Sequence, residues 1–133
     1  MTTFKKIREW GKDSGIDLDL LYSIAVTESS LNPLAVSKAG AQGLFQFMPI
    51  TQKDLADRFG YPFDPFCPRC STIAAGKYLK WLMDHFDSLD QVLGAWNWGY
   101  GNMKAFLRGE KTMPSETKNF IRKVKTKLEN LKE

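Results

Sequence analysis

The chain is poor in the side chains from which metal and redox sites are usually built. Among its 133 residues are only two cysteines, Cys67 and Cys70, and one histidine, His85. A structural zinc site normally takes four ligands, and these three residues fall short, so we expect no metal and no cofactor. A lone Cys-x-x-Cys is a weak redox signal, and here it follows a proline-rich loop, residues 61–66, instead of a strand. We interpret the pair as loop thiols or a local disulfide.

Long apolar runs are also missing. The longest, Leu20–Val26, already contains a tyrosine and a serine, so we expect no insertion into a membrane. The basic N-terminus is followed by Glu9, Lys12 and Asp13, where a secretory leader needs an apolar block. We therefore predict no signal peptide, and a protein that acts outside the cytoplasm would need another route of delivery.

The charge balance is mildly basic, with a formal net charge of +4. Such a balance favours anionic partners such as nucleic acid, acidic glycans or a bacterial envelope. The basic residues cluster only near the C-terminus, where they alternate with apolar positions: Lys118, Arg122, Lys123, Lys125, Lys127 and Lys132. A solvated helix face explains this spacing better than a binding patch. No nucleic-acid motif accompanies it, so we expect no nucleic-acid partner.

Period-two alternation, internal repeats and low-complexity linkers are absent, and helical periodicity dominates. The pattern predicts one all-α domain, residues 1–133, with about six to eight helices. In the first half we expect a helix at residues 4–11, a helix capped by Asp17 that stops at Asn32-Pro33, and a short helical turn over residues 44–48 closed by Pro49. A helix should follow from Thr51, which forms a capping box with Asp54, to Gly60. In the second half we expect a long helix from Ser71 or Thr72 to Phe86, a helix through Val92 and Trp96, a brief segment at residues 103–107, and a last helix from Ser115.

Glu28 stands out because a carboxylate continues an apolar stripe. It lies seven residues after Leu21, about 20° from the same helical face, and follows Ile24 and Ala25 on that stripe. Burial disfavours the charged form, and the carbonyl end of a helix adds negative potential, so we expect a raised pKa for Glu28. A carboxyl group that holds a proton near neutral pH suits general acid catalysis at a glycosidic oxygen. The alternative is a glutamate that bends outward into water or has a structural hydrogen bond.

The residues after Glu28 form an ordered series of short motifs. They are Glu28-Ser29, Asn32-Pro33, Ala35, Ser37, Gly40-Ala41, Gly43-Leu44, Gln46, Met48-Pro49 and Thr51, followed by AAGKYL at 74–79, AWNWGYGN at 95–102 and PSETKNF at 114–120. This series closely resembles the signature of the soluble lytic transglycosylase catalytic domain, which is related to goose-type lysozymes. The resemblance covers about residues 17–125, and it implies a lysozyme-like fold with a substrate cleft.

The resemblance also implies a substrate and a reaction. The substrate would be the peptidoglycan glycan strand, cut between N-acetylmuramic acid and N-acetylglucosamine. Carried over, Glu28 would act as sole acid and base, and the product would be a 1,6-anhydromuramoyl end. Other carboxylates, such as Asp54, Asp57, Asp84 and Glu116, lie at polar helix positions or caps, so we expect them to be structural or solvated.

Six further residues would bind substrate by the same resemblance: Ser37, Gln46, Met48, Trp96, Asn97 and Tyr100. Loop capping for Ser37, helix-surface exposure for Gln46 and core filling for Met48 are the structural alternatives. Gly40 and Gly43 would let the backbone bend close to the ligand. The family usually has tyrosine at Trp96 and at Phe120, so this chain lacks two phenol hydroxyls there.

Two other readings stay open. A goose-type muramidase would hydrolyse the same bond, and an inactive cell-wall-binding module would keep the fold without the chemistry. We expect a monomer that acts on the bacterial cell wall, either as a phage virion or lysis protein or as a domain of a larger protein.

Overall fold

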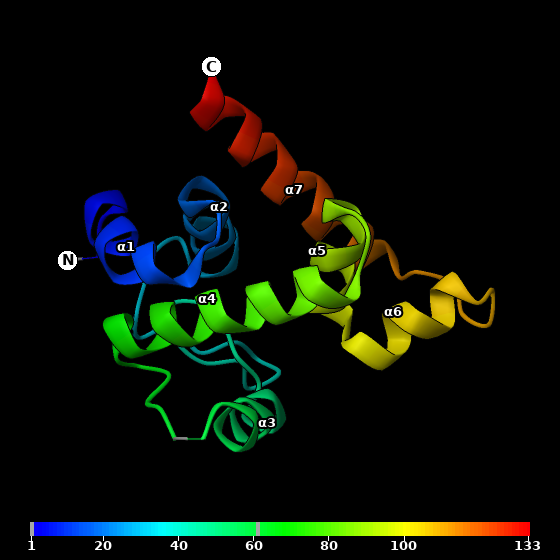
Figure 1. Ribbon diagram of the computed structural model, residues 1–133, viewed down its shortest axis with the longest axis horizontal. Coiled ribbons are helices and arrows are strands. Elements are labelled where there is room, and N and C mark those ends of the chain that lie inside the picture. The colour runs from blue at the N-terminus through cyan, green and yellow to red at the C-terminus, as the bar shows by residue number, and fades with distance from the viewer. Residues whose placement is uncertain (1, 61) are drawn as a thin grey trace. The chain divides into compact units, whose positions relative to one another are not determined.

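The computed structural model describes residues 2–60 and 62–133. These residues form seven α-helices, one 3₁₀ turn and no strand, which confirms the predicted all-α class (Figure 1). Two isolated β-bridges join Val36 to Gln42 and Gln42 to Phe47. The chain divides into two compact units, one up to Tyr78 and one from Leu79 onward, and we describe each by itself.

The N-terminal unit contains α1 (Phe4–Gly11), the 3₁₀ turn η1 (Lys12–Ser14), α2 (Leu18–Ser29), α3 (Pro49–Phe59) and the first part of α4 (Pro68–His85). Helices α1 and α2 pack closely at Gly11, which has no side chain: a methyl group there would overlap the Leu21 side chain. The core of this unit comprises Ile7, Leu20, Leu21, Ile24, Ala25, Leu44, Phe45, Phe47, Leu55, Ala74 and Ala75.

Helix α2 begins as predicted and ends earlier than predicted. Asp17 caps it by accepting a hydrogen bond of 2.9 Å from the Asp19 backbone N–H. The helix ends at Ser29 and not at Asn32-Pro33, because Ser30 has φ 53° and Leu31 has φ 65°. Left-handed backbone at a residue other than glycine is uncommon, and the sequence carries no signal for it.

The predicted turn of helix over residues 44–48 is wrong. Gln46 has φ 53°, which breaks a right-handed turn, and residues 43–46 form a non-helical turn. Pro49 opens α3 at its first position instead of closing a helix, so Thr51 lies inside α3 and is not its cap. The end of α3 at Gly60, with φ 81°, is as predicted.

Helix α4 starts at Pro68, before the predicted caps. Ser71 and Thr72 lie in its first turns, where their hydroxyls donate to the carbonyls of Pro65 (3.3 Å) and Pro68 (2.7 Å). Residues 62–66 are irregular, as expected of the proline-rich loop, and Tyr61 lies outside the described residues. The predicted apolar face is confirmed, since Ala75, Tyr78, Leu79, Leu82 and Phe86 are all buried.

The C-terminal unit holds the end of α4, α5 (Leu89–Trp98), α6 (Tyr100–Leu107) and α7 (Ser115–Lys132). Helix α5 packs against both α6 and α7. The core of the C-terminal unit comprises Leu79, Leu82, Phe86, Val92, Leu93, Ala95, Met103, Ala105, Phe120, Ile121 and Val124. On the basic face of α7, Lys125 bonds the Asp90 carboxylate at 2.7 Å, and this hydrogen bond raises the pKa of Lys125. No helix in the described part of the chain combines the length and apolar character needed to cross a bilayer.

Candidate active site

Glu28 lies in the last turn of α2 and is half-buried. The preceding residues of its stripe, Leu21, Ile24 and Ala25, are fully buried. The periodicity predicted a buried Glu28 on this stripe, and the structure has Glu28 half-buried, where the apolar helix face gives way to the surface. Its role as an acid stays a prediction.

Ser29 connects the end of α2 to the turn that follows in the fold. Its hydroxyl donates to the Leu44 carbonyl at 2.7 Å and contacts the Ala25 carbonyl at 3.2 Å. Directly after it, Ser30 and Leu31 both have positive φ. Such backbone is costly and is often found at functional sites. Sequence reasoning gave Ser29 no role, although its position beside Glu28 in the family motif was a usable signal.

The segment from Ala35 to Phe47 folds back on itself as one hydrogen-bonded loop, which we call the return loop. Gln42 and Phe47 exchange two backbone hydrogen bonds of 3.0 and 3.1 Å. Ser37 is exposed, and its Oγ accepts the Ala41 backbone N–H at 3.0 Å. Ser37 therefore caps the loop, which was the structural alternative, and a contact with sugar stays a prediction.

Gln46 has a clear structural role in the return loop. Its side-chain Nε2 donates to the carbonyls of Gly43 (2.8 Å) and Ala35 (3.1 Å). The predicted alternative, helix-surface exposure, is wrong because Gln46 is half-buried in a turn. Gln52 of α3 supports the same loop, since its Nε2 donates to Gln42 Oε1 at 2.9 Å and to the Phe47 carbonyl at 3.0 Å.

Gly43 brings the backbone of the return loop close to the backbone of Pro65. It has φ +82°, and a methyl group there would overlap the carbonyl oxygen of Pro65. The close neighbour of Gly43 is thus the protein's own chain. Gly40, with φ +94°, has open space where its side chain would be, as expected of a glycine facing solvent or a ligand.

Met48 directly follows the return loop as the N-cap residue of α3 and is 37% exposed, so it does not fill the core. Three other large apolar side chains nearby in the sequence are more exposed: Leu34, Val36 and Ile50. Exposed apolar side chains beside a loop that carries polar groups are typical of a ligand-binding surface.

The other carboxylates occupy ordinary surface positions. Asp54, Asp57 and Asp84 pair with Arg58, Lys53 and Lys80 four residues away on exposed helix faces, at 3.1–3.5 Å. Glu116 is exposed in the first turn of α7. The expectation that these groups are structural or solvated is confirmed.

In the C-terminal unit, Trp96 and Asn97 lie near the end of α5 and are half-buried. Asn97 Oδ1 accepts the hydroxyl of Thr117 at 2.8 Å, which joins α5 to the first turn of α7. Thr117 is almost fully buried, so this bond fixes the side chain of Asn97. Phe120 is buried and contributes packing, as expected from its lack of a hydroxyl.

Tyr100 opens α6 after Gly99 and is 37% exposed. Its ring contacts those of Trp81 and Phe86 at centroid distances of 5.2 and 5.4 Å, and Lys104 Nζ lies 5.5 Å from its centroid. Tyr100 is thus one exposed edge of an aromatic cluster.

The N-terminal unit also contains a cavity of about 500 Å³ that is separate from the predicted site residues. It is lined by residues of α1, η1 and the start of α4, among them Trp10 and Arg69, and by no predicted site residue. The predicted cleft is therefore not this cavity.

The chain was compared with models of known protein families. The family model of the transglycosylase SLT domain matches residues 5–121, which is most of the chain. The chain belongs to the SLT domain family.

Curated relatives of this SLT domain include two proteins named membrane-bound lytic murein transglycosylase C. The one from Glaesserella parasuis is 31% identical and the match covers 85% of this chain and 35% of the relative. The one from Mannheimia succiniciproducens is 38% identical, covering 58% of this chain and 23% of the relative. The chain thus spans about a third or less of the relatives' length.

Solved structures confirm the fold of the SLT domain. The lytic transglycosylase Slt from Pseudomonas aeruginosa superposes with a TM-score of 0.79 at 22% identity, and the match covers 92% of this chain and 22% of that one. The 70-kDa enzyme from Escherichia coli gives 0.80 at 24% identity with the same coverages. A complex of the 70-kDa enzyme with bulgecin A gives 0.83 at 22% identity, covering 95% and 23%.

Proposed function

We propose that this SLT domain is a peptidoglycan lytic transglycosylase that cleaves the bond between N-acetylmuramic acid and N-acetylglucosamine. The observation that carries the proposal is the position of Glu28, half-buried at the end of α2 and followed by Ser29, whose hydroxyl anchors the return loop. Family membership supports the substrate class, because the curated relatives are named murein transglycosylases.

Glu28 is the proposed acid and base of the reaction. As the carboxylic acid it protonates the glycosidic oxygen while the bond to the muramoyl anomeric carbon breaks. As the carboxylate it then accepts the proton of the muramoyl C6 hydroxyl, whose oxygen attacks that carbon and closes the 1,6-anhydro ring. The proton returns to Glu28 and no water is consumed, so the site is ready for another turnover.

Six substrate-binding residues are proposed, and those of each unit are described by themselves. In the N-terminal unit Ser37 and Gln46 would bond sugar substituents, and exposed Met48 would pack beneath a sugar ring. In the C-terminal unit Asn97 would meet an acetamido group and Trp96 and Tyr100 would offer aromatic faces. The N-acetyl group of the substrate itself would stabilise the developing positive charge.

The test is Glu28→Gln, with Glu116→Gln as a matched control on an exposed carboxylate. Because Glu28→Gln removes the general acid, it should lower the rate of sacculus lysis by about 10²–10⁴-fold and leave glycan binding unchanged. The control variant should lyse sacculi at the wild-type rate.

Mass spectrometry of the digest distinguishes the reaction types. An anhydro end is lighter by one water than the reducing end that a muramidase leaves. Equal lysis by wild type and Glu28→Gln would refute the role of Glu28, and an inactive wild type that still binds sacculi would indicate a binding module.

A further inference from the structure

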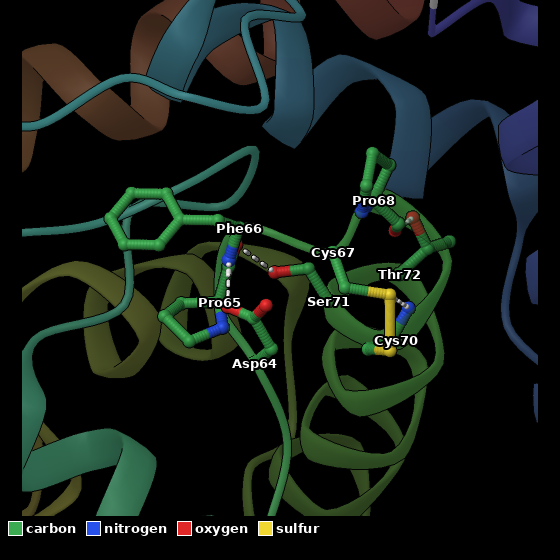
Figure 2. The surroundings of a disulfide bond; sticks show 8 residues. All are labelled: Asp64, Pro65, Phe66, Cys67, Pro68, Cys70, Ser71 and Thr72. Atoms are coloured by element: carbon green, nitrogen blue, oxygen red, sulfur yellow. Dashed lines mark hydrogen bonds between the residues drawn. A yellow bond between two sulfur atoms is a disulfide. The ribbon is translucent and has the colours of Figure 1, made fainter.

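The two cysteines form a disulfide at the start of α4, with Cα atoms 5.2 Å apart (Figure 2). Cys67 directly precedes Pro68, the first residue of the helix, and its carbonyl accepts the Ser71 N–H at 2.9 Å. Its sulfur also accepts the Cys70 backbone N–H at 3.1 Å. Cys67 therefore occupies the N-cap position, with sulfur in the place where serine or aspartate usually puts oxygen.

This position stabilises a negative charge on Cys67 Sγ. The backbone N–H groups of the first helical turn point toward the N-cap, and the helix end adds positive potential. The exposed Arg69, between the two cysteines, brings a cation into the same turn. The nearest acidic residue in sequence, Asp64, has its carboxylate engaged by the Phe66 N–H at 2.9 Å. A thiol whose thiolate is stabilised in this way is a good leaving group in thiol–disulfide exchange.

Solvent can reach the pair. Both cysteines are only half-buried. Arg69 also lines the cavity of about 500 Å³ in the N-terminal unit, which brings solvent-accessible volume to the same turn of α4. Exchange requires that a small dithiol reach the sulfur atoms, and the partial exposure of both residues is consistent with such access.

The disulfide turn is mechanically connected to the return loop. The Cys67 N–H donates to the Asp64 carbonyl at 3.1 Å. The Ser71 hydroxyl donates to the Pro65 carbonyl at 3.3 Å (Figure 2). The same Pro65 carbonyl oxygen lies against the backbone of Gly43. Gly43 in turn is bonded to Gln46 and to the rest of the return loop.

We propose that Cys67–Cys70 is a reversible thiol–disulfide exchange site for a dithiol reductant, and that its oxidised form holds the return loop in place. One part of this proposal rests on the proposed function, namely that the oxidised form is the active enzyme. Wall cleavage would thereby be confined to oxidising surroundings and weakened in a reducing compartment.

The exchange proceeds in two balanced steps. One thiolate of the dithiol attacks Cys70 Sγ, the S–S bond breaks, and the electron pair leaves on Cys67 Sγ. The second thiolate of the dithiol attacks its own sulfur in the mixed disulfide and releases Cys70. The dithiol becomes a cyclic disulfide, the protein gains two electrons, and the two protons of the dithiol pass to the cysteines or to water.

The experiment uses the full chain in buffers of reduced and oxidised dithiothreitol, with thiols trapped by a maleimide and counted by mass. We expect a reversible two-electron transition. Reduction should speed hydrogen exchange at the amides of Gly43 and Gln46 by roughly tenfold, and leave that of Val124 in α7 unchanged. Sacculus lysis should fall in parallel.

Single-cysteine variants test the assignment to Cys67. In Cys70→Ser, the remaining Cys67 should react with iodoacetamide at pH 7 roughly tenfold faster than Cys70 does in Cys67→Ser. The double Cys67→Ser/Cys70→Ser variant should show the fast loop exchange in every buffer.

Three results would overturn the proposal: no reduction by excess dithiothreitol, reduction without faster exchange at Gly43 and Gln46, or equal alkylation rates. If neither redox form lyses sacculi while thiol counts and loop exchange respond as expected, the proposed function fails and the exchange site stands.

Discussion

Gly43→Ala tests whether the return loop is built on a close backbone contact. Gly43 has φ +82°, and a Cβ there would overlap the Pro65 carbonyl oxygen. Left-handed backbone costs an L-residue about 1–2 kcal/mol. Displacing a backbone carbonyl resembles overpacking of a core, which costs a further 1–3 kcal/mol or so. The expected loss in free energy of unfolding is therefore about 2–5 kcal/mol.

Two other glycines separate these contributions. Gly40 has φ +94°, and among the described residues, its two chain neighbours aside, no atom lies within 4 Å of the position that a methyl group would occupy. Gly40→Ala should therefore cost only the backbone strain, about 1–2 kcal/mol. Gly101 is the second residue of α6, and no atom of the other described residues beyond its chain neighbours and helix backbone lies within 4 Å of a methyl group there. Gly101→Ala should therefore stabilise the helix, by up to roughly 0.5–1 kcal/mol. Alanine restricts the unfolded chain equally in all three variants, so this effect cancels in the comparison.

Urea denaturation followed by far-UV circular dichroism measures all three variants against wild type. The midpoints should fall in the order Gly101→Ala, Gly40→Ala, Gly43→Ala, from most to least stable, at an unchanged denaturant slope. A loss for Gly43→Ala that is no larger than the loss for Gly40→Ala would refute the close contact with Pro65.

Two further predictions concern the N-terminal unit. Burial, with a smaller contribution from a neighbouring carboxylate, raises the pKa of Tyr78 to about 12, so the unfolded phenol ionises first as pH rises from 10. Stability should then fall between pH 10 and 12 by up to about 3 kcal/mol, and Tyr78→Phe should remove this part of the alkaline loss in urea titrations at each pH. Ser29→Ala takes a donor from the buried Leu44 carbonyl and should cost about 1–3 kcal/mol in thermal denaturation, with slower sacculus lysis; unchanged stability and lysis would contradict the anchoring role of Ser29.

The parts of the fold that could be predicted are those encoded by neighbouring residues. Apolar periodicity located the long α-helices and the stripe of α2 that leads to Glu28, because a helix repeats within a few residues of sequence. Helix α6 begins at Tyr100, inside a stretch that was expected to be broken by glycine. Asp17 and Gly60 set helix ends through their own backbone and side-chain preferences. Such signals are complete within one segment of chain.

The errors arose where distant contacts decide the backbone. Ser30 and Gln46 have positive φ, although neither is a glycine. The Ser29–Leu44 hydrogen bond spans 15 residues, and the Gln46–Ala35 bond spans 11. Bonds of this kind can hold a costly backbone conformation, but their partners are not apparent from local sequence.

The same contacts determine how the candidate residues could recognise a sugar. Both N–H groups of the Gln46 amide are engaged, by the Gly43 and Ala35 carbonyls, so a substrate bond to Gln46 has to be accepted by its Oε1. Asn97 is engaged at the opposite end, since its Oδ1 accepts the Thr117 hydroxyl. This bond orients the amide and leaves its Nδ2 as the donor that we assign to the substrate under the proposed function. Under the proposed function, the N-terminal unit therefore supplies an acceptor for a sugar hydroxyl or amide N–H. The C-terminal unit supplies a donor for an acetamido carbonyl, and each side chain is oriented by a protein bond before any glycan binds.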